Sequence, residues 1–183
     1  MRILYIPFCM LLLLMASCTP GNLSFSEAME RNNDKFETEE EREDAAFLVE
    51  AADYNLLMTK LSDIAANQAY SRVVTDFGAK SLSDHQQIEA KLRQLSKEKK
   101  VALGAEIGER HLDMLEDVKQ ADKRNIDRIY LNTIEIIQER VLRMYEEAAL
   151  NANDAEVRAF AASQLEIFRN HNRRAQEIRD ELI

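Results

Sequence analysis

Two sets of residues in this sequence have types and spacings that could do chemistry: a cysteine near the start and two histidines far apart in the chain. The cysteine, Cys18, follows Met15-Ala16-Ser17 at the end of an apolar run. Small residues after a short apolar stretch mark a signal cleavage site. A cysteine at the cut position is typical of bacterial lipoproteins, in which the thiol is acylated and becomes the new N-terminus. Cys18 is therefore the predicted lipidation site.

The segment before Cys18 has the layout of a signal peptide. Arg2 supplies a positive start, and residues 3–14 supply about a dozen apolar residues, which is short of the roughly 20 that a bilayer span needs. We predict residues 1–17 to be a lipoprotein signal peptide. The expected location is the bacterial envelope, with the protein lipid-anchored to the outer membrane and facing the periplasm. Cys9 leaves with the signal, so no thiol remains for a disulfide or a thiolate metal site.

The two histidines, His85 and His171, fall on apolar stripes of two different predicted helices, and Asp84 precedes the first. One hypothesis is a metal-binding or proton-handling site inside a helical bundle, built from Asp84, His85 and His171. The more frequent alternative is a pair of core histidines that are hydrogen-bonded to a carboxylate or a carbonyl. Both remain open from the sequence.

A carboxylate-bridged di-iron site requires Glu-x-x-His on two helices. The residues three positions before the two histidines are Leu82 and Phe168, which cannot ligate iron. The third histidine, His111, follows Glu109-Arg110 on the predicted short helix, and as an isolated polar residue it is predicted to lie on the surface. We find no catalytic constellation, so we expect no enzymatic activity and no cofactor, with a metal ion as the one candidate.

After Pro20 the chain has no proline, and its apolar residues repeat at helical spacing. Thr38 and Glu41 form a capping box at the start of the first long helix. A second long helix ends near Lys100, a short helix covers 109–120, a third long helix runs over 126–148, and a fourth runs from 157 to 182, with Asn153 as its expected N-cap. Gly78, inside the second long helix, is expected to allow close helix approach.

These elements predict an all-α fold: an antiparallel up-down four-helix bundle with a short extra helix in the middle connection. The predicted division is a signal peptide at 1–17, the lipidated cysteine and a polar tether at 18–38, and the bundle domain at 39–183. A weakly patterned short helix around Phe25 to Arg31 is the alternative for part of the tether. The net charge of −9 argues against nucleic acid as a partner and against electrostatic docking to anionic lipid. The expected membrane attachment is thus the lipid on Cys18 alone, with the protein partner and oligomeric state left open.

A series of short motifs follows in this order along the chain: Phe47-Leu48, Ala51-Ala52, Leu61 to Ala65, Val74, Phe77, Asp84-His85, Leu92, Leu95, His111-Leu112, Leu115, Ile126-Asp127, Tyr130, Val157 to Ala161, Leu165, His171 and Ala175. In these the chain resembles a bacterial envelope family of unknown function, domain-of-unknown-function family 4142, over about residues 45–178. The resemblance implies a ferritin-like bundle. Where the family commonly has Glu on the first long helix this chain has Met58 and Lys60, and Gln138 stands where the family has His.

Three functional hypotheses follow. The leading one is a non-catalytic, lipid-anchored helical bundle that acts in the envelope as a binding or stress-associated module. The second is a metal-binding redox or storage protein with a degenerate ferritin-like site. The third is a chaperone-like or adaptor surface for an envelope partner.

Overall fold

The computed structural model describes residues 22–182, and every regular element in that part of the chain is helical. The elements are α1 (Phe25–Lys35), α2 (Glu39–Gln68), α3 (Arg72–Glu98), the 3₁₀ turn η1 (Glu109–His111), α4 (Leu112–Lys119), α5 (Ile126–Asn151) and α6 (Ala155–Leu182). The predicted all-α class is confirmed. The expected short helix between the second and third long helices is also present, as η1 and α4.

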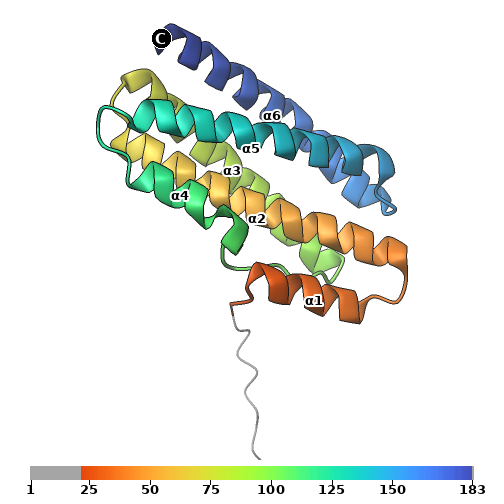
Figure 1. Ribbon diagram of the computed structural model, residues 1–183. Coiled ribbons are helices and arrows are strands. Elements are labelled where there is room, and N and C mark those ends of the chain that lie inside the picture. Colours follow the sequence, from red (N-terminus) through yellow and green to blue (C-terminus); the bar gives the residue numbers. More distant parts are fainter. Residues whose placement is uncertain (1–21, 183) are drawn as a thin grey trace, which may run out of the picture.

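The four long helices share one core (Figure 1). Helix α2 packs on α3 and on α5, and α6 packs on α5 and on α3, so each long helix has two long neighbours. Each contributes one apolar stripe to the shared interior, as the sequence spacing predicts. The largest fully buried side chains come from all four helices: Tyr130, Tyr145, Leu48, Leu57, Met58, Leu61, Ile88, Leu92, Ile126, Ile134, Ile137 and Ile178.

Gly78 marks the closest approach of α2 and α3. A Cβ built at Gly78 would lie 2.7 Å from the backbone nitrogen of Ala66 and 2.8 Å from the Cβ of Ala65. No side chain fits there without moving α2 away, so the prediction that this glycine allows close helix approach is confirmed. Its lost helix propensity, about 1 kcal/mol relative to alanine, is offset by that packing.

Hydrogen bonds at the helix starts test the two predicted caps. The Thr38 hydroxyl accepts from the backbone N–H of Glu41, whose carboxylate accepts from the Thr38 N–H, which confirms the capping box. At α6 the cap is Asp154 and not Asn153, because Asp154 Oδ1 accepts from the N–H groups of Glu156 and Val157. A carboxylate in that position also favours the positive end of the helix dipole.

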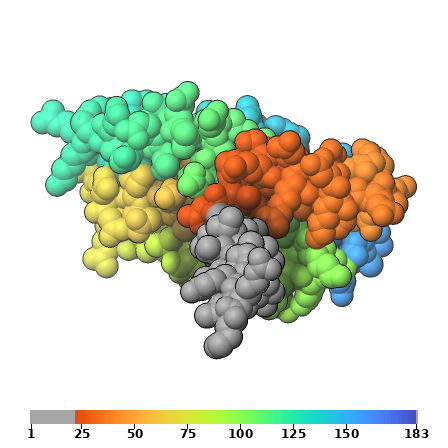
Figure 2. Space-filling view, turned by 90° about the horizontal axis from the view of Figure 1, so that it is seen from below, coloured from red at the N-terminus to blue at the C-terminus, as the bar shows by residue number. Residues whose placement is uncertain are grey.

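Part of the segment predicted as a polar tether is a helix. Residues 25–35 form α1, which packs on α2 and lies against the segment that follows α3 (Figure 2). Ser24 and Glu27 make a capping box, and the buried amide of Asn32 both donates to the carbonyl of Ala102 and accepts from its N–H. These bonds fix α1 to the bundle. The signal peptide, Cys18 and the first part of the tether lie outside the described residues.

None of the helices within residues 22–182 combines the length and the apolar character that a membrane span requires.

Candidate functional site

His85 and His171 both lie in the core, as predicted. His85 on α3 is 1% exposed and His171 on α6 is 5% exposed. Their ring centroids lie 5.6 Å apart, with the ring planes at 55°. Residues 86 positions apart in the chain are thus neighbours in the interior, and we refer to them as the histidine pair.

The hydrogen bonds of Asn55 fix the tautomer of His85. The Asn55 amide nitrogen donates to the backbone carbonyl of His85 and to Glu89 Oε2, so its oxygen is left as an acceptor. That oxygen lies 2.9 Å from His85 Nδ1, which must therefore carry the proton. In a neutral ring the other nitrogen, Nε2, then holds a lone pair.

His171 is fixed in the same manner by a carboxylate. Its Nε2 donates to Asp84 Oδ2 over 2.8 Å, and Asp84 is also held by Lys80 one turn earlier on α3. Asp84 thus joins α3 to α6 as the carboxylate partner of His171. Burial raises the pKa of Asp84, but the bonds from Lys80 and His171 outweigh burial and hold it below its usual value. The lone pair of neutral His171 is then on Nδ1.

Both rings are neutral. Burial, assisted by the neighbouring His171, lowers the pKa of His85 to about 3, although Asp84 opposes the shift. Burial also lowers the pKa of His171, and the bond to Asp84 only partly counters it. The chemical consequence is that each ring offers one lone pair at any pH near neutrality.

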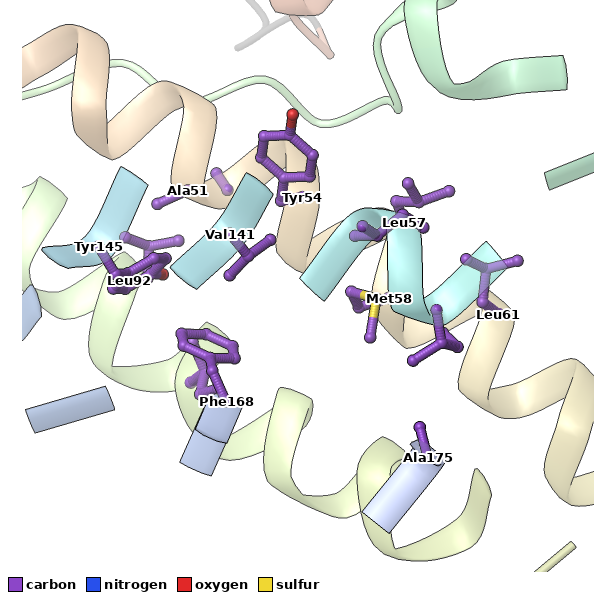
Figure 3. Packing of buried hydrophobic residues seen from close by; sticks show 14 of the residues in the cluster. Ala51, Tyr54, Leu57, Met58, Leu61, Leu92, Val141, Tyr145, Phe168 and Ala175 are labelled. Atoms are coloured by element: carbon purple, nitrogen blue, oxygen red, sulfur yellow. The ribbon is translucent and has the colours of Figure 1, made fainter. Parts of the chain in front are cut away.

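Within the described part of the chain, those two lone pairs have no partner. His85 Nε2 and His171 Nδ1 are both fully shielded from solvent and make no hydrogen bond. A void of about 10 Å³ adjoins His85 and is also lined by Met58, Tyr54 and Phe168. This volume is about what a single water molecule requires. Figure 3 shows Met58 from α2 and Phe168 from α6 directed into the same interior.

The di-iron centre that a ferritin-like bundle implies does not fit these residues. Within residues 22–182, no group of three or more histidine, cysteine or carboxylate side chains is placed to hold a metal ion. Gln138 is buried on α5, and neither polar atom of its side-chain amide has a hydrogen-bond partner among the described residues. The one carboxylate at the histidine pair, Asp84, is already shared between Lys80 and His171.

A second polar cluster, which the sequence did not predict, lies between α2 and the segment before α4. Its centre is the buried carboxylate of Asp53. Asp53 Oδ1 accepts from the Gly108 N–H over 2.7 Å, and Oδ2 accepts from the Arg110 guanidinium at 3.1 and 3.2 Å. His111 Nδ1 lies 3.2 Å from the same Oδ2, outside hydrogen-bond geometry. We call these four residues the Asp53 cluster.

The prediction that His111 lies on the surface is wrong, because the side chain is 2% exposed and stacks on Tyr54 with centroids 4.6 Å apart. Arg110 lies between two rings, 4.4 Å from the centroid of Phe25 and 5.4 Å from that of Tyr54. Burial raises the pKa of Asp53, but His111, the Gly108 amide and Arg110 together hold it below its usual value. The cluster therefore fastens α1, α2 and η1 around one carboxylate.

A groove of about 750 Å³ lies between α2 and α5. Its apolar lining comprises Ala46, Phe47, Met144 and Ala148. Its charged lining is mostly acidic, because it contains Glu43, Asp44, Glu50 and Glu147 and one cation, Arg143. The groove thus offers an apolar strip with a negative border.

Comparison with known proteins gives one match. A family described as "Domain of unknown function (DUF4142)" matches residues 30–178. That range includes the second half of α1, so the family's domain begins before the predicted boundary at residue 39. No curated protein and no solved structure matches the chain.

Proposed function

Because the chain belongs to the DUF4142 family, whose function is unknown, we propose from its geometry that it is a non-catalytic, lipid-anchored docking module of the bacterial envelope. The observation that carries this proposal is the groove between α2 and α5. Its occupant, we propose, is a basic amphipathic helix of a partner protein.

The shape of the seam between α2 and α5 supports a helical occupant. Helix α4 already lies on one part of this seam and packs on both helices, with Val118 buried and Met114 and Leu115 half-buried against the core. The groove lies farther along the same two helices, toward the start of α2 and the end of α5 (Figure 1). The seam therefore accepts an amphipathic helix in one part and leaves the other part open.

The charges at the groove support a basic occupant. Glu147 is exposed and forms no ion pair within residues 22–182, and Glu43 accepts a hydrogen bond from the side-chain amide of Asn153. The single cation, Arg143, is 3.8 Å from Glu139 on its own helix. Lysine or arginine side chains on a docked helix would meet unpaired carboxylates while its apolar face covers Phe47 and Met144.

The lipid anchor is proposed on the sequence around Cys18. Only residues 19–24 separate that cysteine from α1, and six residues reach at most about 20 Å. The domain would therefore stand close to the outer membrane on its periplasmic side. Three acyl chains on Cys18 exceed the two signals that stable anchoring requires.

We also propose that α2, α3, α5 and α6 form a bundle of ferritin-like topology, in which two antiparallel helix pairs are joined by one long crossover. The short links 69–71 and 152–154 make the pairs α2–α3 and α5–α6 antiparallel, whereas residues 99–125 lead from the end of α3 to the start of α5, which runs in the same direction as α3 and not antiparallel to it as predicted (Figure 1). Leu82 and Phe168 stand three residues before His85 and His171, where a di-iron site requires Glu. This chain would therefore be a ferritin-like bundle without the carboxylate site.

A binding measurement with matched charge variants tests the docking proposal. The probe is a fluorescently labelled amphipathic peptide of about 18 residues built from leucine and lysine, titrated with the mature protein in detergent and followed by anisotropy. We expect saturable binding that Glu147→Lys weakens about tenfold, since the added cation repels the peptide.

The control variant is Asp63→Lys, which makes the same charge change on an exposed part of α2 away from the groove. It should leave the affinity within about twofold. Equal weakening by both variants, or equal binding of a leucine–glutamate peptide, would show general charge attraction and contradict a docking groove.

Mass spectrometry of the protein extracted from membranes tests the anchor separately. We expect a chain that begins at Cys18 and carries a diacylglyceryl group and an acylated amine. A different N-terminus, or an unmodified Cys18, would overturn the anchor and leave the groove proposal standing.

A further inference from the structure

The histidine pair carries an inference that is independent of the groove. We propose that His85 and His171 form a buried site for a soft monovalent metal ion, Cu(I) or its analogue Ag(I), with the thioether of Met58 as a third donor. The two histidines lie at the interface of α3 and α6, and Met58 on α2 lines the small void beside His85.

The first step concerns what the two unpartnered atoms can bind. His85 Nε2 and His171 Nδ1 are both lone-pair acceptors, because Asn55 and Asp84 hold the protons on the other nitrogens. Two acceptors cannot bond to each other. Only a hydrogen-bond donor such as water, or a cation, satisfies them.

The second step concerns spacing. A metal ion about 2 Å from each ring nitrogen lies about 3.1 Å from each ring centroid, which places two ligating rings about 5.1 Å apart for a tetrahedral angle and about 6.3 Å for a linear one. The observed centroid separation is 5.6 Å, inside this range. The bonds to Asn55 and Asp84 are those by which proteins orient metal-ligating histidines.

The third step concerns charge. A divalent ion would bring two positive charges into a site whose one carboxylate, Asp84, is already compensated by Lys80. Burial of that uncompensated charge is costly. A monovalent ion bound by neutral nitrogen and sulfur donors introduces half the charge and accepts two or three ligands.

The fourth step concerns the third donor. Met58 is 1% exposed and lines the same small void as His85. Thioether sulfur is a soft ligand that favours Cu(I) over zinc, iron or magnesium. A core methionine that lines the same void as the His85 ring therefore favours the same ion as the charge argument.

The test is an anaerobic competition for Cu(I) between the mature full-length protein in detergent and the coloured chelator bicinchoninate. We expect one Cu(I) per chain to be withheld from the chelator, and Zn²⁺ not to be retained. His85→Leu and His171→Leu should abolish retention, whereas Asn55→Ala, which frees the His85 ring, should weaken it by about 10- to 100-fold. Met58→Leu should weaken binding and leave the stoichiometry at one.

The matched control is His111→Leu, which removes another buried histidine and should leave Cu(I) retention unchanged. A second measurement avoids variants altogether: on addition of Ag(I) to ¹⁵N-labelled wild-type protein, the imidazole signals of His85 and His171 should shift and those of His111 should not. No Cu(I) retention, retention that survives His85→Leu, or Ag(I) shifts confined to His111 would overturn the proposal and leave a bound water molecule as the partner of the two nitrogens.

Discussion

The Asp53 cluster and the histidine pair are both buried and both contain histidine, yet their polar atoms are partnered in opposite ways. Asp53 is one acceptor group surrounded by donors from Gly108 and Arg110, with His111 close by. His85 and His171 each hold one acceptor that no donor reaches. A cluster with surplus donors around a carboxylate holds elements together, whereas a cluster with surplus acceptors is open to a ligand.

The first prediction tests this contrast by removing the carboxylate of Asp53. We expect Asp53→Ala to lower the free energy of unfolding by about 3 kcal/mol, since it leaves the Gly108 amide and the Arg110 guanidinium without their acceptor. Urea denaturation measures the change. The control Glu50→Ala removes a half-exposed carboxylate 3.6 Å from Arg110 and should cost less than 1 kcal/mol. An equal loss of unfolding free energy in both variants would show that the buried Asp53 carboxylate stabilises the fold no more than the half-exposed Glu50 does.

The second prediction uses pH. The pKa of His85 is about 3 in the folded protein and about 6.5 in the unfolded chain, so between these values unfolding takes up a proton. Stability is then complete above pH 6.5 and falls as the pH drops, by about 2 kcal/mol from pH 7 to pH 5. His171, whose pKa is also lowered, adds a loss of the same sign.

His85→Leu should flatten the stability profile between pH 5 and 7. Asp53, whose folded pKa lies below its usual value, contributes stability above pH 3.8 that is lost only below it. Asp53→Asn should therefore keep the slope between pH 5 and 7 and remove the loss below pH 4. A His85→Leu variant with the wild-type slope would contradict the assignment of that window to the histidine pair.

The smallest predicted effect concerns α1. Phe25→Ala removes the ring on which Arg110 lies and should weaken the docking of α1 by about 1 kcal/mol. Amide hydrogen exchange in α1 should then accelerate about fivefold while exchange in α2 stays unchanged. Unchanged exchange in α1 would show that the Asp53 cluster does not fasten this helix.

The long helices could be predicted from the sequence, because each carries an uninterrupted apolar stripe. Helix α1 was predicted only as an alternative to a polar tether, since the apolar spacing in that segment is weak, although Ser24 and Glu27 form a capping box there. Its stability comes from tertiary bonds such as those of Asn32 to Ala102, 70 residues away, which no local pattern contains.

The site was predictable in part. His85 and His171 lie on stripes, so their burial followed from spacing, but the partner Asn55 is on another helix and is visible only in the fold. The surface prediction for His111 was wrong because it treated the residue as an isolated polar side chain that follows Glu109-Arg110. Its spacing of +4 to Leu115 and +3 more to Val118 was the signal for a buried position.

The most direct test of the contrast between the two clusters is the protonation of the imidazole nitrogens, measured by long-range ¹H–¹⁵N correlation on ¹⁵N-labelled protein free of metal at pH 7. We predict that His85 is neutral with its proton on Nδ1 and that His171 is neutral with its proton on Nε2, so that two lone pairs remain in the core. A doubly protonated ring, or the opposite tautomer in either residue, would contradict the account.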